Sequence, residues 1–380
     1  MEENFTAQNG EEAPIVPKKR GRGRPRKNES VNSQTGNNDS VSYIDYLPDK
    51  NQEVCEQHLE MFFDTMLERQ LIWKKRFVDK IEAPWTDDPY FKEHKFTNLY
   101  RELDRSSQYL INNIIRDESN SLKNIVWKII VYRMFNSPEA FKALSFIWKA
   151  GIPDYEDYEN DKDKFVDVVD AIKATGGKLF TSAYIISSSL TPGETREHCY
   201  TKVVMPAIHK NIDKIMDICL LAENPEDIIK VLRNLPCVEK FIAHELYSDL
   251  IYINKYSKYQ IFSFDANSFT NVGPGSSLGI RLIYPAYNNA KEQLQGIYRL
   301  LSIAEEQLKL AEQRKGESMP YTEWNTELGR YVITDKFNLT LSQIEGWLCE
   351  FSKYWKMYIS KGKQRQHFVE KSSNDAYDLM

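Results

Sequence analysis

The feature that most constrains the fold is a helical repeat of apolar residues that returns in segment after segment. Residues 54–70, 204–222, 288–312 and 341–357 place large apolar side chains at a spacing of about 3.6 positions, the period of an α-helix. Residues 121–135 are apolar almost all round, as in a central buried helix. Only 16 glycines and 15 prolines interrupt the 380 residues. We therefore predict an all-α core over residues 46–360, with one short strand at residues 329–334.

The two ends of the chain lack this repeat. Residues 1–45 are rich in Glu, Asn, Ser, Gly and Pro, and residues 361–380 are polar, so we predict a disordered N-terminal tail and a polar C-terminal tail. The acidic stretch 153–164 is predicted to be a surface loop.

The five cysteines form no CxxC pair, which favours a reducing, intracellular setting. No signal peptide is visible, and no apolar run reaches the ~20 residues of a membrane span, so no membrane partner is expected.

Several kinds of site are excluded by spacing. The six histidines show no metal-ligand pattern, so no metal is predicted. Gly176-Gly177-Lys178 lacks both the earlier glycine and the following Ser or Thr of a Walker A motif, which excludes ATP binding by that motif. No cofactor is evident from the sequence.

A concentrated basic arm stands out against the acidic remainder of the chain. Residues 18–27 hold seven Lys or Arg; without them, 43 basic residues face 55 acidic ones, a net charge of −12. Part of the arm resembles an AT-hook, in which glycine enters a narrow groove, proline keeps the strand extended and arginines reach the floor of an A·T minor groove. The motif consists of Arg22, Gly23, Arg24, Pro25, Arg26 and Lys27.

The alternatives for this arm are a nuclear-localisation patch and a plain cationic tail. In each case counterion release favours duplex DNA or RNA as a partner, and the AT-hook favours A·T-rich double-stranded DNA. We therefore expect a DNA-associated protein, in the nucleus of a eukaryote or in the cytoplasm of a bacterial host.

Two polar stretches of the body have the character of anion sites. The Gly-rich run 271–281 contains Gly273, Gly275 and Gly279, and at such a run backbone amides could approach a phosphate closely. Arg281 could add a bidentate contact to the same phosphate. The alternative is a helix-capping turn. Upstream, Arg101, Asp104, Arg105 and Gln108 are spaced to share one face of a helix, which suits phosphate or base recognition. Such a stripe can equally be a salt-bridged surface face.

Residues 235–243, followed by Asp265, have the order of a helix-hairpin-helix DNA glycosylase: a hairpin, a helix and then an acid. A hairpin of this kind faces backbone N–H groups towards a DNA phosphate. Cys237 and Glu239 stand where the glycosylase hairpin normally has glycines. The alternative is an ordinary helix pair.

Four ordered stretches carry a closer resemblance. They are RxxDRxSQY (101–109), FxxHExxxDL (241–250), GPGxxxGI (273–280) and IExxLCExxxY (344–354). Together they resemble the α-glutamyl/putrescinyl thymine pyrophosphorylase family, whose helical module is also found in 5-hydroxymethyluracil DNA kinases. The resemblance spans residues 90–356 and implies a helix-hairpin-helix, DNA-glycosylase-like helical domain.

The resemblance implies chemistry on a flipped base of DNA. Pyrophosphate would leave the methylene of 5-(pyrophosphoryloxymethyl)uracil, and an amine or amino acid would take its place. A separate 5-hydroxymethyluracil DNA kinase would prepare that substrate. One alternative is a DNA glycosylase for a modified base, and another is a non-catalytic DNA-binding partner of such a kinase.

Residue roles follow as expectations. Arg101, Arg105 and Arg281, with the amides of the glycine loop, would hold the pyrophosphate. Gln108 and Tyr109 would contact the DNA. A carboxylate would deprotonate the incoming amine, with Asp265 as first choice and Asp249 and Glu350 behind it. These arginines, the glycine loop and one acid are expected to meet in a single cavity.

Overall fold

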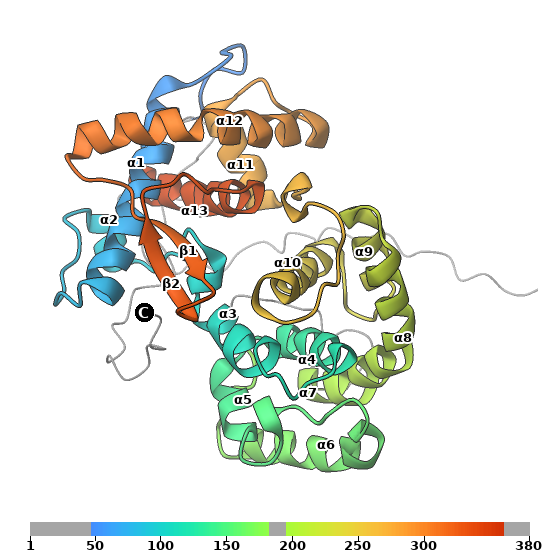
Figure 1. Cartoon of the computed structure of the whole chain (residues 1–380). Helices are drawn as coiled ribbons and strands as arrows, with labels where there is room; N and C mark the ends of the chain where they lie inside the picture. Colours follow the sequence, from blue (N-terminus) through green and yellow to red (C-terminus); the bar gives the residue numbers. More distant parts are fainter. Residues whose placement is uncertain (1–46, 182–194, 361–380) are drawn as a thin grey trace, which may run out of the picture. The chain divides into compact units, whose positions relative to one another are not determined.

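The computed structural model describes residues 47–181 and 195–360, and these are mostly helical. The predicted all-α core is therefore confirmed. The AT-hook motif and the predicted C-terminal tail lie outside the described residues. In its first half the chain forms the following elements (Figure 1): α1 (Glu56–Trp73), η2 (Lys74–Val78), α2 (Pro89–Glu93), η3 (Arg101–Leu103), α3 (Arg105–Leu110), η4 (Ile111–Ile115), α4 (Leu122–Phe135), α5 (Pro138–Leu144), η5 (Lys149–Gly151) and α6 (Tyr158–Ala174).

The second half begins after the gap in the described residues. It forms α7 (Arg196–Cys199), η6 (Tyr200–Val204), α8 (Met205–Leu221), α9 (Pro225–Leu232), α10 (Lys240–Tyr256), η7 (Ala266–Ser268), α11 (Pro274–Ile283), α12 (Ala290–Lys315), β1 (Tyr321–Asn325), β2 (Arg330–Thr334) and α13 (Leu341–Ser360).

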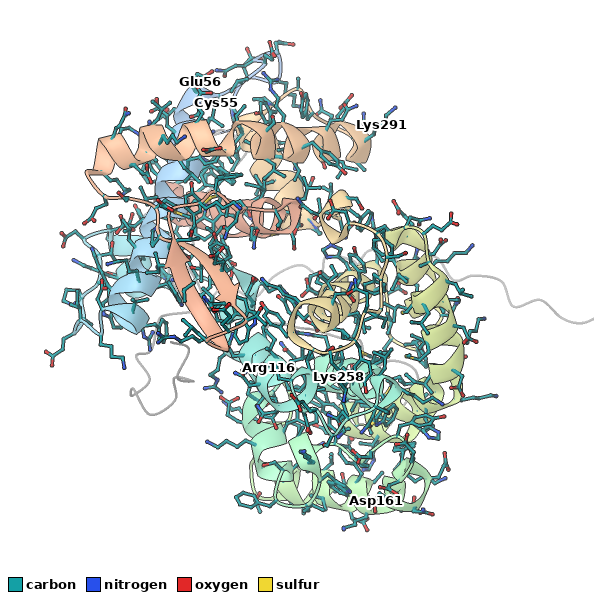
Figure 2. All side chains as sticks on the ribbon, in the orientation of Figure 1. Cys55, Glu56, Arg116, Asp161, Lys258 and Lys291 are labelled. Atoms are coloured by element: carbon teal, nitrogen blue, oxygen red, sulfur yellow. The ribbon has the colours of Figure 1, made fainter. Side chains whose placement is uncertain are left out.

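Two groups of packed helices make up most of the described core. The first joins the beginning and the end of the described chain, because α1 packs with α11, α12 and α13 (Figure 1). The second consists of α4, α8, α9 and α10. The apolar faces meet in a core that includes Phe62, Trp127 and Trp347, each almost fully buried. Exposed charged side chains such as Glu56, Lys258 and Lys291 are labelled in Figure 2.

Local sequence sets where several helices begin and end. The Ser121 hydroxyl accepts the Asn124 N–H at 3.1 Å and caps α4, and Ser137 caps α5, whose first residue is Pro138. Asn289 caps the start of α12, and the helix ends at Lys315, followed by Gly316, whose φ of 69° is the left-handed conformation that glycine adopts easily.

The structure corrects two expectations about secondary structure. Residues 101–108 do not share one helix: η3 covers 101–103, Asp104 is extended at φ −72° and ψ 142°, and α3 begins only at Arg105. The acidic stretch 153–164 is not wholly a loop, since α6 begins at Tyr158. Glu159 and Asp161 lie in the first turn of α6, where negative charge is favourable to the helix dipole.

The predicted short strand is confirmed. β2 pairs antiparallel with β1, with Tyr321 opposite Thr334 and Trp324 opposite Tyr331. The Tyr331 hydroxyl lies 2.7 Å from the Tyr256 hydroxyl of α10, which ties the hairpin to the second helix group. No described helix has the length and apolar character to cross a membrane.

α9 and α10 pack against each other and are joined by residues 233–239. Cys237 in this turn has φ 62°, a conformation that favours glycine, at one of the positions where a glycosylase hairpin has one. Glu239 is extended, with φ −85°. The turn is therefore tight, and the helix-hairpin-helix assignment stays a prediction.

Candidate functional site

Asp249 joins two arginines from distant parts of the sequence. Its carboxylate accepts from Arg101 Nη1 at 2.7 Å, from Arg133 Nη2 at 2.7 Å and also from Arg133 Nε. Arg101 Nη2 donates at 2.9 Å to Glu245, one turn earlier on α10. Asp249 and Arg133 are 0% and 1% exposed, whereas the Arg101 side chain is 23% exposed. Arg101 therefore connects a fully buried ion pair with the outside.

A second acid, Asp104, lies close to this network. It accepts from the Asn98 backbone N–H at 3.1 Å and from Asn98 Nδ2 at 3.0 Å, and Arg69 in turn donates to Asn98 Oδ1 at 2.5 Å. Burial raises the pKa of Asp104 to about 6, although Asn98 and the charges of Arg69 and Arg101 oppose the rise. Burial lowers the pKa of Arg69 to about 10, so this arginine is still charged at neutral pH.

A third acid, Glu345 of α13, lies at the first turn of α11. Burial raises the pKa of its carboxyl to about 7, and the negative charge of Glu245 adds to the rise. The Ser276 hydroxyl, the Gly273 N–H and the Cys349 thiol act in the opposite direction, since they favour the ionised form. Burial keeps the Cys349 thiol protonated by raising its pKa far above the usual range, and its Sγ lies 3.9 Å from Glu345 Oε1.

These contacts bring three of the four motif stretches together, and the fourth, GPGxxxGI, packs against α13 beside Glu345. The residues involved lie on α1, α4, α10 and α13 and in the segment from η3 to Asp104, and they act on one another as ion pairs or as neighbouring charges. We call them the motif cluster. It consists of Arg69, Arg101, Asp104, Arg133, Glu245, Asp249, Glu345 and Glu350. Arginines can hold an anionic group here, and a carboxyl that titrates near neutrality can transfer a proton.

The glycines of the GPGxxxGI stretch pack α11 against α13. A Cβ on Gly279 would lie 2.4 Å from the Leu348 carbonyl oxygen, and one on Gly275 would lie 2.9 Å from Cys349 Sγ. The Gly273 N–H donates to the Ser276 hydroxyl at 2.9 Å, which caps α11. The helix-capping alternative therefore describes the local structure, and close helix packing accounts for Gly275 and Gly279 without an anion.

Asp249 and Glu350 differ in their surroundings. Asp249 is held by two arginines, as described above. Glu350 accepts the Thr97 backbone N–H at 3.1 Å and lies 3.5 Å from Lys353 Nζ. Asp265, the first choice as a base, is exposed and accepts the Asn267 N–H at 2.9 Å at the start of η7. Its described hydrogen bond is local, and it is not in the motif cluster.

Two of the predicted phosphate ligands make their contacts elsewhere. Arg105 forms an ion pair with Glu139 of α5. Arg281 Nε donates to the Ser277 carbonyl of its own helix at 3.2 Å. Of the arginines expected to meet an acid and the glycine loop, the structure places Arg101 in the motif cluster.

The predicted DNA contacts Gln108 and Tyr109 lie in the interior. They are 2% and 3% exposed. Gln108 donates to the Glu102 carbonyl, and Tyr109 stacks on Tyr132 with ring centroids 5.3 Å apart. Both side chains would have to leave these positions to reach DNA.

Sequence reasoning passed over four members of the motif cluster as site residues: Arg69, Arg133, Glu245 and Glu345. The signal for two of them was present, because Glu245 and Glu345 belong to the quoted motifs. Glu345 also stands four positions before Cys349, which places both on the face of α13 that meets α11. Arg133 lies within an almost wholly apolar helix, and only its partner Asp249 explains it.

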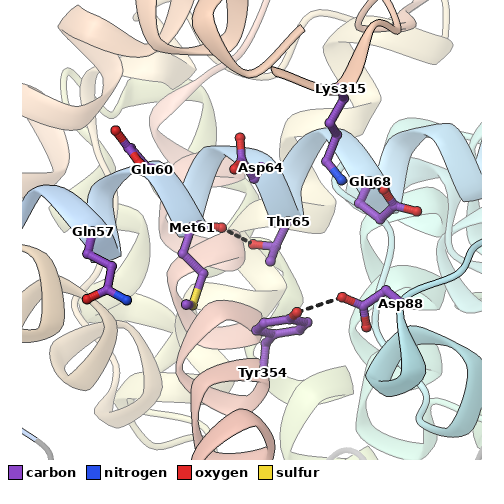
Figure 3. Close-up of a pocket in the computed structure, with 9 residues that line it drawn as sticks. All are labelled: Gln57, Glu60, Met61, Asp64, Thr65, Glu68, Asp88, Lys315 and Tyr354. Atoms are coloured by element: carbon purple, nitrogen blue, oxygen red, sulfur yellow. Dashed lines mark hydrogen bonds and ion pairs between the residues drawn. The ribbon is translucent and has the colours of Figure 1, made fainter. Parts of the chain in front are cut away.

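A surface pocket lies apart from the predicted site residues (Figure 3). Its lining is Gln57, Glu60, Met61, Asp64, Thr65, Glu68, Asp88, Lys315 and Tyr354. Its acids are largely engaged: Asp64 pairs with Arg314 at 2.7 Å, Glu68 with Lys315 at 2.7 Å, and Asp88 accepts from Tyr354 at 2.6 Å. Within the described ranges, no group of three or more His, Cys, Asp or Glu is arranged to hold a metal.

Comparison with known proteins gives two findings. The model of the helical domain of 5-hmdU DNA kinase matches residues 56–364. The "5-hmdU DNA kinase" of Bacillus phage SP10 is 27% identical over 311 residues, which are 80% of this chain and 45% of that protein. The chain thus spans less than half the length of this curated relative. No solved structure matches the chain.

Proposed function

The chain belongs to the family of 5-hmdU DNA kinase helical domains, and we propose from this membership that it takes part in the modification of thymine bases in DNA. The observation that carries the proposal is the motif cluster, since three of the four motif stretches, together with Arg69 of α1 and Arg133 of α4, supply one group of interacting charges. A purely structural domain needs no such concentration of buried charge, because ion pairs in an interior are costly to desolvate.

The reaction that we propose replaces pyrophosphate by an amine or amino acid on 5-(pyrophosphoryloxymethyl)uracil in DNA. The target carbon lies inside the duplex, so the nucleotide has to be flipped out at a cost of a few kcal/mol. Arg101 is the first candidate to stabilise the leaving pyrophosphate, because its side chain is partly exposed while it is held in place by Glu245 and Asp249. Arginine suits this role since its fork of donors fits phosphate oxygens.

A direct assay tests the reaction. DNA that carries pyrophosphorylated hydroxymethyluracil is incubated with the protein and a pool of amines, then digested to nucleosides for mass spectrometry. We expect amine-substituted thymidine from the wild-type chain and a loss of product with Arg101→Gln. The matched control is Arg330→Gln, since Arg330 is an exposed arginine on β2, away from the motif cluster.

A second candidate is a non-catalytic helical partner of a separate 5-hydroxymethyluracil DNA kinase. The observation in its favour is the 45% coverage of the phage kinase, which leaves the larger part of that protein unmatched. The same assay separates the candidates. Unchanged substrate favours the partner role, whereas an abasic site would favour the glycosylase alternative.

We propose A·T-rich double-stranded DNA as the binding partner, through the arm 17–27, which lies outside the described residues. The test is a deletion of residues 17–27, followed by binding to A·T-rich and G·C-rich duplexes across a range of salt. A selective loss on A·T-rich DNA supports the AT-hook. An equal loss on both duplexes reduces the arm to a cationic tail.

A further inference from the structure

Phe241 of α10 places a half-exposed aromatic ring one helical turn from the motif cluster. It opens the FxxHExxxDL stretch and is 49% exposed. Phe241, Glu245 and Asp249 stand four positions apart on α10, so they follow one another along one face of the helix. Arg101 binds both acids, at 2.9 Å and 2.7 Å. The Phe241 ring and the partly exposed guanidinium of Arg101 therefore border the same stretch of α10.

Two further rings adjoin Phe241. His244 stands three positions after it on α10, and its ring centroid lies 6.1 Å from that of Phe269, in the segment between η7 and α11. Tyr247 meets Phe269 edge to face from the interior, also with 6.1 Å between the ring centroids. We call Phe241, His244 and Phe269 the aromatic platform. His244 is buried and Phe269 is half-buried, so Phe241 is the end of the platform that faces solvent.

The position of Phe241, rather than its exposure, carries the argument, because single exposed apolar residues are common on protein surfaces. A base that has left the duplex presents a flat face that aromatic side chains cover by stacking. An α-helix rises about 5.4 Å per turn. One turn of α10 thus separates the ring that would stack on the base from the Arg101–Glu245 ion pair that would face its pyrophosphate.

The aromatic residue expected from sequence is less suited to this task. Tyr109 is 3% exposed and stacks on Tyr132 with ring centroids 5.3 Å apart. A base could reach the Tyr109 ring only after these two rings separate, whereas the Phe241 ring is already accessible.

We propose that Phe241 stacks on the flipped base as the exposed end of the aromatic platform, an inference that rests on the proposed action on thymine bases in DNA. The ligand class is an extruded pyrimidine nucleotide that carries an anionic group on its 5-methylene. Stacking fixes the plane of the pyrimidine ring, and Arg101 faces the anionic group. Phe241 binds and orients the base and transfers no proton.

The first test measures binding without turnover. The probe is a DNA duplex with one 5-hydroxymethyluracil opposite guanine, because a mispaired base costs less to flip. The affinity of the full chain for this duplex is measured by fluorescence anisotropy, with no amine present. We expect Phe241→Ala to bind about 5- to 150-fold more weakly, the loss that removing one base–aromatic stack predicts. Phe241→Trp should restore the affinity, since it restores a stacking surface.

Two controls make this result specific. Phe146→Ala removes another exposed phenylalanine, 92% exposed in the segment after α5, and should keep the wild-type affinity. A fully paired duplex that lacks 5-hydroxymethyluracil should bind Phe241→Ala and wild type almost equally. A loss of the same size on both duplexes would overturn the proposal, because Phe241 would then not act on a flipped base.

The second test locates the base. In the same duplex 5-iodouracil replaces 5-hydroxymethyluracil, and long-wavelength ultraviolet light crosslinks it to an aromatic side chain that stacks on it. Peptide mapping by mass spectrometry should find the crosslink at Phe241. Phe241→Ala should lose it at DNA concentrations that saturate the variant, and Phe241→Trp should keep it. A crosslink confined to another residue overturns the proposal.

The outcomes also separate this proposal from the reaction on which it rests. A chain that crosslinks through Phe241 but makes no amine product keeps the aromatic platform and ends the proposed reaction. A chain that makes product, with Phe241→Ala keeping the wild-type affinity and rate, ends only the role of Phe241.

Discussion

Asp249 and Glu345 are both acids in the motif cluster, yet their surroundings are opposite. Asp249 has two arginines, at 2.7 Å each, and is 0% exposed. Glu345 has a hydroxyl, a backbone N–H and a thiol for neighbours, and the facing charge is the negative Glu245. Cations stabilise a carboxylate, whereas burial beside a like charge favours the neutral acid. One acid is therefore suited to hold the fold together and the other to exchange a proton.

The largest expected effect comes from removing the charge of Asp249. Asp249→Asn keeps the shape of the side chain but leaves Arg101 and Arg133 without this partner. Because an uncompensated buried charge is costly, we expect a loss of about 3–5 kcal/mol in the free energy of unfolding, measured by urea denaturation.

The control is Asp213→Asn, which breaks a surface ion pair between Lys123 and the 69% exposed Asp213. Breaking an exposed pair should cost less than about 1 kcal/mol. Equal losses in the two variants would show that the buried arginines do not depend on Asp249.

Glu345→Gln should raise the free energy of unfolding, whereas Asp249→Asn should lower it, and the size of the increase should depend on pH. The folded state binds the Glu345 proton more tightly than the unfolded state, since burial raises the pKa from 4.5 to about 7. The wild-type chain therefore loses stability as the pH rises from 4.5 to about 7, whereas the Glu345→Gln variant has no carboxyl here to ionise and does not. We expect equal stabilities near pH 4.5 and a variant that is more stable by up to about 3 kcal/mol above pH 8.

The measurement is urea denaturation of both proteins at several pH values. Asp104, whose pKa burial raises to about 6, is present in both and drops out of the difference. A variant that is less stable than wild type at high pH would mean that the Glu345 carboxylate has a cationic partner in solution.

A smaller effect is expected where α11 meets α13, next to Glu345. In Gly279→Ala the new methyl group would lie 2.4 Å from the Leu348 carbonyl oxygen, so a helix has to shift. We expect a loss of about 1–3 kcal/mol in the free energy of unfolding. Gly346→Ala is the matched control, because a Cβ there meets nothing within 4 Å and alanine favours a helix. If Gly279→Ala were tolerated as well as Gly346→Ala, close packing would not explain this glycine.

Sequence alone located the helices better than it assigned the residues of the site. Helical periodicity located α1, α8, α12 and α13, because each buries a regular apolar face, and apolar character on all sides located the buried helix α4. It failed at residues 101–108, where polar spacing fits one helix but Asp104 is extended and separates η3 from α3. The glycines of GPGxxxGI fitted either an anion-binding loop or a helix-capping turn, and only the position of α13 decided between the two.

The roles of the charged residues depended on partners that sequence does not reveal. Arg101 and Asp249 were both singled out, but nothing in the sequence indicated that they pair with each other and with Arg133. Glu345 was present in a quoted motif. Its raised pKa depends on burial and on Glu245, which lies 100 positions away in the sequence.

The smallest effect on stability is expected at Arg105, which sequence grouped with Arg101. Arg105 pairs with Glu139 at the surface, with side chains 30% and 53% exposed. Arg105→Ala should therefore cost less than about 1 kcal/mol in the free energy of unfolding. A partly exposed arginine can exchange its carboxylate for a DNA phosphate at little cost, so if Arg105 contacts DNA, the slope of log affinity against log salt should shrink by about 1. Filter binding across salt measures this, with the exposed Arg330→Ala as control. An unchanged slope would leave Arg105 a surface ion pair and confine the arginine chemistry to the motif cluster.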